Sequence, residues 1–242
     1  SVLLACPAIL IWGALQLRRS PAFPLAGAPQ TRGVTLGWAA PIYDWYCPRL
    51  GLGDRFRRET LRHAGLVQGE RVLDVGCGTG VLTRLAAEVV GAAGQIIGVD
   101  AAPAMIAVAR ERAQRAGSAA RFEVAAIETL PFADASFDVV LCSAMLHHLP
   151  PDVKDMGLRG VRRVLKPDGR LVIVDLDRPA NPLWWWLFAP MLLMPMTASN
   201  LRSEIPDFLH RAGFGRVEAR GRWMGLLTFW VAHPKRARGT TS

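Results

Sequence analysis

The sequence predicts an α/β fold in which a mostly parallel sheet of seven strands carries helices on both faces and closes with an antiparallel strand pair. One observation is the stretch 71–80, RVLDVGCGTG, where a short β-branched run leads into three glycines at alternate positions. A second is the alternation of strand-like and helix-like runs up to residue 176, which is typical of parallel sheets. A third is the segment 205–234, which reads as one helix and two strands and therefore predicts the antiparallel pair.

The individual elements follow from ordinary start and stop signals. Asp54 is expected to cap a basic helix that ends at Gly65, and Val81 begins the helix behind the glycine loop. Pro103 stands at a good first helical position, and the periodic run behind it ends at Gly117. The other helices are expected at 150–165 and behind a cap at Ser203, and the other parallel strands at 95–100, 120–126, 136–142 and 170–176.

The glycine loop at 76–80 indicates a ligand at the switch from strand to helix. Glycines allow a tight turn and a close approach of the backbone, and the N-terminus of the following helix points at that ligand. The dinucleotide fingerprint GxGxxG would need a glycine where the chain has Val81, and the Lys and Ser/Thr of a P-loop are missing. Asp100 ends the next strand, where a carboxylate can accept hydrogen bonds from both ribose hydroxyls. A ribose without a pyrophosphate is therefore indicated.

Four stretches of the chain together resemble a known family. VLDVGCGTG, the acidic Asp100, LPFADASFDVVLCSAMLHHL and RRVLKPDGRLVIVDL are similar to class I S-adenosylmethionine (SAM) dependent methyltransferases, within them to the group of the ubiquinone and menaquinone biosynthesis methyltransferases. The resemblance covers roughly residues 43–176. It implies a Rossmann-like fold, SAM as cofactor and no metal. It does not identify the acceptor, because this group methylates carbon, oxygen, nitrogen and sulfur on many small molecules.

On this resemblance, the glycine loop would cradle the methionine part of SAM and Asp100 would hold the ribose. Tyr43 matches an aromatic residue that helps to cover the cofactor, and Met105 matches an apolar residue on the adenine face, although a core role is an equal alternative for both. The expected cofactor-binding residues are Tyr43, Asp74, Gly76, Cys77, Gly78, Gly80, Asp100, Ala101, Met105, Ile127, Glu128 and Ser143.

The chain departs from its relatives just before the Leu-Pro-Phe turn. Many members carry Gly-Asp there, with the Asp meeting the adenine amino group, whereas this chain has Ala125 and Ala126. We therefore expect adenine to be recognised by backbone groups near Ile127 or by Glu128.

Two histidines, His147 and His148, follow the fourth predicted strand at its carboxyl end, where ligands bind in such sheets. A histidine near the transferred methyl group could take a proton from the nucleophile, since its unperturbed pKa is about 6.5. Leu-His-His-Leu is also common in the group across unrelated substrates. A helix-capping or cofactor-loop role is therefore the alternative to a general base.

The net charge of +9 lies on the flanks of the chain. Residues 1–70 carry 8 Lys and Arg against 4 Asp and Glu, residues 71–196 carry 13 against 13, and residues 197–242 carry 8 against 3. Basic flanks suit anionic lipid, nucleic acid or an acidic substrate, with a merely soluble surface as the alternative. No RNA-binding module is recognisable, so a nucleic acid partner is not expected. The four cysteines show no ligand spacing and are typical of a reducing, cytosolic setting.

Two apolar segments point to a lipophilic setting. Residues 2–17 are almost wholly apolar and precede Arg18 and Arg19, which favours a membrane anchor with its C-terminal side in the cytoplasm, or else an amphipathic or core-packed helix. Residues 182–196, PLWWWLFAPMLLMPM, contain three consecutive tryptophans and no charge, and their internal prolines prevent one straight spanning helix. This insert is expected to line an apolar cavity or to lie in the membrane interface, and packing within the domain is the alternative.

The expected organisation is an apolar segment at 1–19, a linker at 20–33, a methyltransferase domain at 34–233 that includes the insert 182–196, and a basic tail at 234–242. The expected function is SAM-dependent methyl transfer to a small lipophilic acceptor, either a quinone-like ring or a lipid headgroup. The reaction is placed at or near the membrane, on its cytoplasmic side, or in the cytoplasm. An RNA methyltransferase and a non-catalytic SAM-binding interaction protein are the alternatives. The sequence indicates no oligomeric state.

Overall fold

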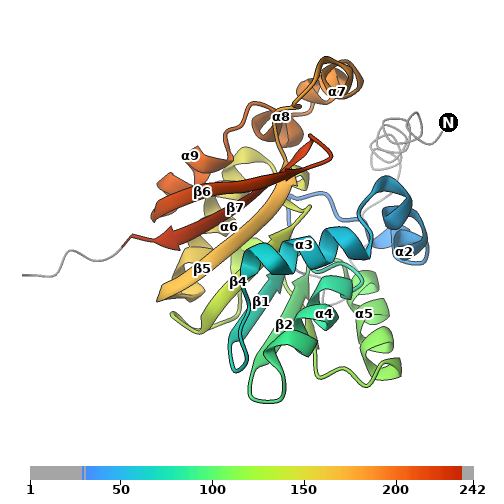
Figure 1. Ribbon diagram of the computed structural model, residues 1–242, viewed down its shortest axis with the longest axis vertical. Coiled ribbons are helices and arrows are strands. Elements are labelled where there is room, and N and C mark those ends of the chain that lie inside the picture. The colour runs from blue at the N-terminus through green and yellow to red at the C-terminus, as the bar shows by residue number, and fades with distance from the viewer. Residues whose placement is uncertain (1–28, 30, 236–242) are drawn as a thin grey trace, which may run out of the picture.

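A computed structural model describes residue 29 and residues 31–235 of the chain. Its centre is a seven-stranded sheet with the strand order β3-β2-β1-β4-β5-β7-β6 (Figure 1). Strands β1 to β5 run parallel to one another, and β7 runs antiparallel to both β5 and β6. This is the predicted fold, including the closing antiparallel pair. The strands are β1 Arg71–Val75, β2 Gln95–Asp100, β3 Arg121–Val124, β4 Phe137–Ser143, β5 Leu165–Leu176, β6 Phe214–Trp223 and β7 Leu227–Pro234.

Helices cover both faces of the sheet because the strand residues alternate between two cores. Val72 packs with α3 (Asp54–Ala64) and α4 (Val81–Val90) on one face. Leu73 and Val75 pack with α6 (Pro151–Val164) and α9 (Ile205–Arg211) on the other. Figure 1 shows α3 and α4 in front of the sheet and α6 behind it. Outside the apolar insert, the other helices are α5 Pro103–Arg115, α2 Tyr43–Tyr46 and the 3₁₀ turns η1 Gly37–Ala39, η2 Cys47–Leu50, η3 Ile127–Thr129 and η4 Leu146–His148.

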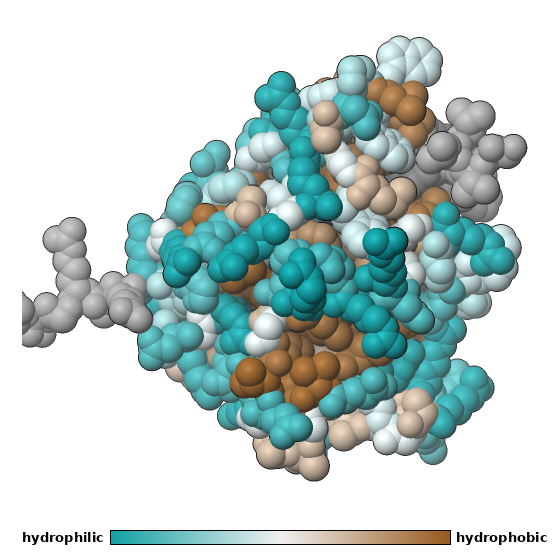
Figure 2. Space-filling model, in the orientation of Figure 1, coloured by the Kyte–Doolittle hydropathy of each residue, from teal (hydrophilic) through white to brown (hydrophobic). Residues whose placement is uncertain are grey.

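The front face differs in character between its two helices. Figure 2 shows mostly hydrophilic side chains over α3 and an apolar area over α4. The first agrees with the basic, amphipathic sequence of α3, which buries Phe56, Thr60 and Ala64 and turns its arginines outward. On α4, Val89 is 38% exposed.

Both expected side-chain caps are wrong. Asp54 is the first helical residue of α3, behind Gly53, and makes no capping hydrogen bond. Ser203 has a left-handed φ of 63°, and its hydroxyl donates to Asp177 at 2.6 Å, so α9 begins two residues later. In each case a tertiary contact or a glycine turn replaced the local cap that the sequence pattern favoured.

Two strands differ from their expected bounds by more than one residue at an end. The fifth begins at Leu165 and not at residue 170, because Leu165 pairs with Phe137 of β4 before an irregularity in the register. The third ends at Val124, two residues early. The chain then turns into η3, which brings Ile127 and Glu128 toward the carboxyl end of β2.

The apolar insert breaks at its prolines, as predicted. It forms α7 Pro182–Phe188 and η5 Ala189–Leu193, and Pro195 begins α8 Pro195–Leu201. In Figure 1, α7 stands beyond the edge of the sheet, next to the turn between β6 and β7. None of the helices within the described residues is long and apolar enough to cross a membrane. The expected anchor at 1–19, most of the linker and most of the basic tail lie outside the described residues.

Candidate active site

A first space, called the glycine-loop hollow, lies at the carboxyl ends of β1 and β2. It has a volume of about 80 Å³. The loop turns back sharply because the N–H groups of Gly76 and Cys77 both donate to the carbonyl of Val99, at 2.8 and 3.0 Å. Gly76 and Gly78 have φ angles of 73° and 55°, which favour glycine. A Cβ on Gly76 would collide with Met145, whereas a Cβ on Gly78 would point into the hollow, 3.7 Å from Tyr43. The loop thus leaves room for a ligand at Gly78.

Asp100 closes the hollow at the end of β2. Its Oδ2 accepts a hydrogen bond from the N–H of Gly78 at 3.0 Å, and its Oδ1 accepts one from Ala102 at 2.8 Å. Burial raises the pKa of Asp100, and these two hydrogen bonds oppose that rise. Each carboxylate oxygen retains further acceptor capacity, so the side chain can take two more donors from a diol.

Glu128 on η3 lines the same hollow and carries a buried carboxylate oxygen to which no described residue donates a hydrogen bond. Its Oε1 accepts a hydrogen bond from the hydroxyl of Thr31 at 2.6 Å. Its Oε2 is buried and has no hydrogen-bond partner among the described residues. Because a buried acceptor without a donor is costly, the arrangement fits a ligand that brings an N–H group to this point. Met105 and Ile127 supply apolar surface beside it.

A second space, the Asp74 hollow, has a volume of about 40 Å³ and lies under the start of α4. Asp74 accepts a hydrogen bond from the hydroxyl of Thr83 at 2.6 Å. Burial, with a smaller contribution from nearby Asp100, raises the pKa of Asp74 to about 6. A cation bound beside it would restore the charged form. Cys77 and Ser143 line the same hollow.

A third space, the apolar cavity, has a volume of about 400 Å³ and lies between α2, η2, η4 and α7. Its wall is mainly apolar and includes four side chains of the apolar insert: Trp184, Leu187, Phe188 and Met191. The polar groups on the wall include both histidines and Arg49. A space of this size and polarity is typical of a site for a small organic ligand.

The three spaces meet at Tyr43 and Ala144, which line all of them. Ala144 has a left-handed φ of 52° and is held by its N–H, which donates to the carbonyl of Val174 at 2.7 Å. Burial raises the pKa of the Tyr43 phenol, so this hydroxyl stays protonated at neutral pH. A ligand filling the two smaller hollows would therefore reach the apolar cavity at these two residues.

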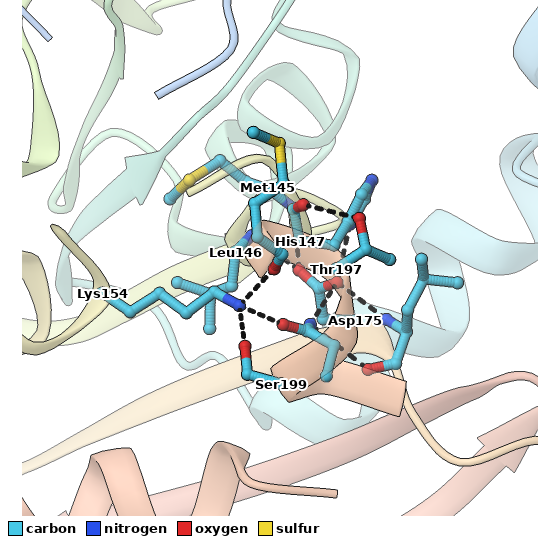
Figure 3. Close-up of polar contacts among 10 residues, drawn as sticks. Met145, Leu146, His147, Lys154, Asp175, Thr197 and Ser199 are labelled. Carbon is cyan, nitrogen blue, oxygen red and sulfur yellow. Dashed lines mark hydrogen bonds and ion pairs between the residues drawn. The ribbon is translucent and has the colours of Figure 1, made fainter. Parts of the chain in front are cut away.

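Asp175, at the end of β5, anchors the histidine turn from below (Figure 3). Its Oδ2 accepts hydrogen bonds from the N–H groups of Met145 and Leu146, at 2.9 and 2.7 Å. Its Oδ1 lies 2.7 Å from Nδ1 of His147 and also accepts from the N–H of Leu176. Burial alone would raise the pKa of Asp175, but His147 and these hydrogen bonds hold it below its usual value.

The buried Lys154 is linked to the carboxylate of Asp175 through the side-chain amide of Asn200. The Nζ of Lys154 donates to the carbonyl of Met196 and the hydroxyl of Ser199, each at 2.6 Å, and to Oδ1 of Asn200. The amide nitrogen of Asn200 then donates to Oδ1 of Asp175 at 3.1 Å. Burial lowers the pKa of Lys154 to about 8. Figure 3 shows the ammonium reaching α8 from α6, so this network ties the end of the insert to the histidine turn.

The two histidines have different environments. His148 stacks on His147 with ring centroids 4.0 Å apart. Burial, with smaller electrostatic effects of His147 and Lys154, lowers the pKa of His148 to about 3. A base that weak stays unprotonated and accepts protons poorly. His147 has a carboxylate behind its ring, and its Nε2 has no partner among the described residues.

Most of the expected site residues line the hollows. The glycine-loop hollow takes Tyr43, Gly76, Gly78, Asp100, Ala101, Met105, Ile127 and Glu128, and the Asp74 hollow takes Asp74, Cys77 and Ser143. Gly80 lines neither; a Cβ there would press on the ring of Phe122, so this glycine serves packing. Sequence reasoning missed Lys154 and Asn200, whose only signal was a polar residue on an otherwise buried helix face. No cluster of metal-ligating side chains occurs in the part of the chain that the structure describes.

A seven-stranded sheet that closes with an antiparallel pair, a glycine loop after β1 that lacks the dinucleotide fingerprint, and a carboxylate after β2 are together typical of a class I SAM-binding fold. A model of the methyltransferase domain family matches residues 72–169. Among solved structures, a SAM-dependent methyltransferase from Aquifex aeolicus has a TM-score of 0.65 and 23% identity, covering 82% of this chain and 98% of that one. A Haemonchus contortus phosphoethanolamine N-methyltransferase, solved with SAM, has a TM-score of 0.64 and 20% identity, covering 82% and 57%.

Curated relatives agree with this class. An uncharacterised methyltransferase of Synechocystis is 33% identical over 172 residues, which are 68% of this chain and 76% of that protein. The 2-phytyl-1,4-naphtoquinone methyltransferase of Synechococcus elongatus is 39% identical over 60% of this chain and 63% of its own length. The ubiquinone/menaquinone biosynthesis C-methyltransferase of Ectopseudomonas mendocina is 40% identical over 55% and 52%. The chain thus spans half to two thirds of these two quinone enzymes, and it belongs to the SAM-dependent methyltransferase family.

SAM is the cofactor of this family, and the residues present fit it. Gly78 leaves open space, Asp100 retains acceptor capacity for a ribose, and Glu128 holds an unpartnered buried oxygen where an adenine amino group would come. Asp74 faces the smaller hollow, where the charged amino group of the methionine part would lie.

Proposed function

We propose that the protein transfers a methyl group from SAM to a small lipophilic acceptor bound in the apolar cavity. The observation that carries the proposal is the meeting of the two smaller hollows with the apolar cavity at Tyr43 and Ala144. When bound, SAM supplies a methyl group on a positively charged sulfonium. The chain's own task is to align donor and acceptor in a space that excludes water.

His147 is the residue that we assign to proton removal from the acceptor. Asp175 lies 2.7 Å from its Nδ1, which favours the tautomer with the proton on that nitrogen and leaves Nε2 as the basic atom. His147 lines the apolar cavity, so Nε2 is available to a hydroxyl or an acidic ring position of the acceptor. His148, with its pKa near 3, contributes packing beside it.

The chemistry of the cavity favours a quinone-like ring over a bulky polar substrate. Leu187, Phe188 and Met191 offer apolar surface, while His147 supplies one polar end. Two relatives at 39 and 40% identity bear the names of quinone methyltransferases, which supports the same acceptor class. A lipid headgroup is the second acceptor that the cavity would take. Both acceptors reside in lipid, so we place the reaction at or near a membrane.

The test is methylation of a membrane lipid extract by the full chain. Purified protein, SAM and detergent-dispersed lipid extract are incubated, and mass spectrometry searches for species that gain one methyl group. We expect such a species with the wild type and much less of it with His147→Asn, while SAM binding by calorimetry stays the same. Absence of any methylated lipid would contradict the proposal. Transfer of labelled methyl to RNA would favour the RNA alternative instead.

A further inference from the structure

Exposed large apolar side chains cluster around the apolar cavity. Ten such side chains occur among the described residues, and seven of them belong to only three segments: 38–45, 183–193 and the turn at Met224. We call these seven the apolar rim. The rim consists of Trp38, Ile42, Trp45, Leu183, Trp186, Leu193 and Met224. The other three, Val67, Val89 and Met156, lie elsewhere on the molecule.

The same three segments, together with Tyr46 directly after the first, also supply part of the wall of the cavity. On α2, Tyr43 and Tyr46 line the cavity while Trp45 between them is 64% exposed. On α7, Trp184 lines the cavity while Trp186 is 86% exposed. Each helix therefore turns one side toward the cavity and the other toward solvent. Met224 belongs to both the rim and the cavity wall, because it lines the cavity and is 48% exposed. Figure 2 shows apolar surface at the tip where α7 stands.

Arginines stand among the aromatic rings near the rim. The guanidinium of Arg49 lies 4.1 Å from the ring centre of Trp45, Arg55 lies 5.7 Å from Trp223, and Arg178 lies 5.9 Å from Trp185. Within the described residues, none of these three arginines has a carboxylate at ion-pair distance.

Two of the carboxylates nearby are already engaged, and Asp54, which precedes Arg55 on α3, forms no ion pair with it. Asp44 on α2 pairs with Arg112 and accepts the hydroxyl of Thr79. Asp177, just before α7, accepts from Thr228 at 2.6 Å and from Arg222 at 3.4 Å. The rim therefore presents apolar and aromatic side chains together with positive charge that no described carboxylate neutralises.

We propose that the apolar rim docks on an anionic lipid bilayer and that the lipophilic acceptor enters the cavity directly from the bilayer. Tryptophan and arginine in combination suit the boundary between headgroups and acyl chains, and unpaired arginines are complementary to anionic headgroups. The entry of the acceptor from the bilayer rests on the proposed function, because that function requires a lipophilic acceptor in the apolar cavity. The docking itself requires no turnover and can be tested separately.

The test places nitroxide labels on the rim of the full chain. Cys6→Ser serves as background, because the structure shows Cys47 and Cys142 buried and Cys77 partly buried. Single variants Trp45→Cys and Trp186→Cys report on the rim, and Val67→Cys and Met156→Cys are matched controls at exposed apolar positions outside it. Collision rates with oxygen and with a water-soluble nickel complex are measured with vesicles of phosphatidylcholine and phosphatidylglycerol. We expect rim labels to gain oxygen collisions and lose nickel collisions severalfold, and control labels to change little.

Three outcomes would overturn the docking. Rim labels that remain as accessible to nickel on vesicles as in solution would show that another part of the chain binds lipid. Rim labels already shielded before vesicles are added would show that a segment of this chain covers the rim. Shielding accompanied by dipolar broadening between labels would point to a second copy.

A flotation assay provides the complementary measurement. The double variant Trp45→Ser with Trp186→Ser should partition into anionic vesicles on the order of tenfold less than the control Val67→Ser with Met156→Ser. SAM binding should be equal in both, since neither pair lines the glycine-loop hollow. If the protein docks on vesicles but methylates no lipid extract, the proposed function is wrong and the docking of the rim still holds. If the protein methylates dispersed lipid but does not dock on vesicles, the docking is wrong and the proposed function still holds.

Discussion

Nδ1 of His147 and Oδ1 of Asp175 lie 2.7 Å apart, although 28 positions separate the residues in the chain. The pair forms because β4 and β5 are neighbours and end at the same edge of the sheet. The backbone N–H groups of Met145 and Leu146 hold the other carboxylate oxygen. The ring of His147 is thereby fixed in one orientation against the cavity.

Replacing Asp175 with Asn should therefore lower turnover while SAM affinity stays nearly constant. The amide cannot select the productive tautomer of His147, so we expect a loss within the range of general-base catalysis, roughly 10²–10⁴-fold. The measurement is kcat on the methylated lipid together with the calorimetric Kd for SAM. Asp177→Asn, two residues further on, is the control and should retain activity. Full turnover in both Asp175→Asn and His147→Asn would remove the base assignment.

The second prediction concerns the ribose. Asp100→Asn keeps the shape of the side chain but removes its charge, so SAM should lose about 1–3 kcal/mol of binding free energy, about 5–150-fold in Kd. Thermal unfolding without SAM tells this loss apart from damage to the loop, because Asp100 also holds the N–H groups of Gly78 and Ala102. Calorimetry with an unchanged Kd would argue against a contact with the ribose.

The third prediction uses the unpartnered oxygen of Glu128. If this oxygen accepts from the adenine amino group, wild-type protein should bind S-adenosylhomocysteine several times more tightly than S-inosylhomocysteine, which lacks that group. Glu128→Gln should reduce this preference, and the coupling between the two changes measures the contact. Thr31→Val, which removes the donor to the other oxygen, is the control and should preserve the preference. Equal discrimination by wild type and Glu128→Gln would place adenine recognition on backbone groups.

The fourth prediction concerns the pH dependence of stability. Burial lowers the pKa of Lys154 from 10.5 to about 8, so between these values the unfolded chain binds more protons than the folded chain. Stability should therefore rise with pH across this window, by up to about 3 kcal/mol, relative to a variant without the lysine. Urea unfolding of wild type and Lys154→Met from pH 7 to 10.5 measures the difference, with the half-exposed Lys166→Met as control. Parallel curves for wild type and Lys154→Met would contradict a lowered pKa. If Lys154→Met does not fold, a direct NMR titration of the Lys154 side chain replaces it.

Elements encoded by neighbouring residues were predictable. Val72 to Val75 form a strand because β-branched apolar residues suit a buried parallel sheet, and Gly76 and Gly78 turn because only glycine adopts their backbone angles without strain. Pro190 broke the insert at its expected place, since proline cannot continue a helix interior. The two predicted side-chain caps were wrong. For Ser203 the reason is a partner distant in sequence, because its hydroxyl donates to Asp177 instead of capping α9.

The sequence by itself determined the α/β topology, the cofactor class and most of the residues around the glycine loop, because each rests on a contiguous pattern of residues. Only the tertiary structure decided which histidine has a carboxylate behind it, and only it placed Lys154 beside Asn200, 46 positions away. It also divided the tryptophans of the insert, with Trp184 on the cavity and Trp186 in solvent. Burial and hydrogen-bond partners arise from packing between separate elements, and no local pattern records which side of a short helix will face a cavity.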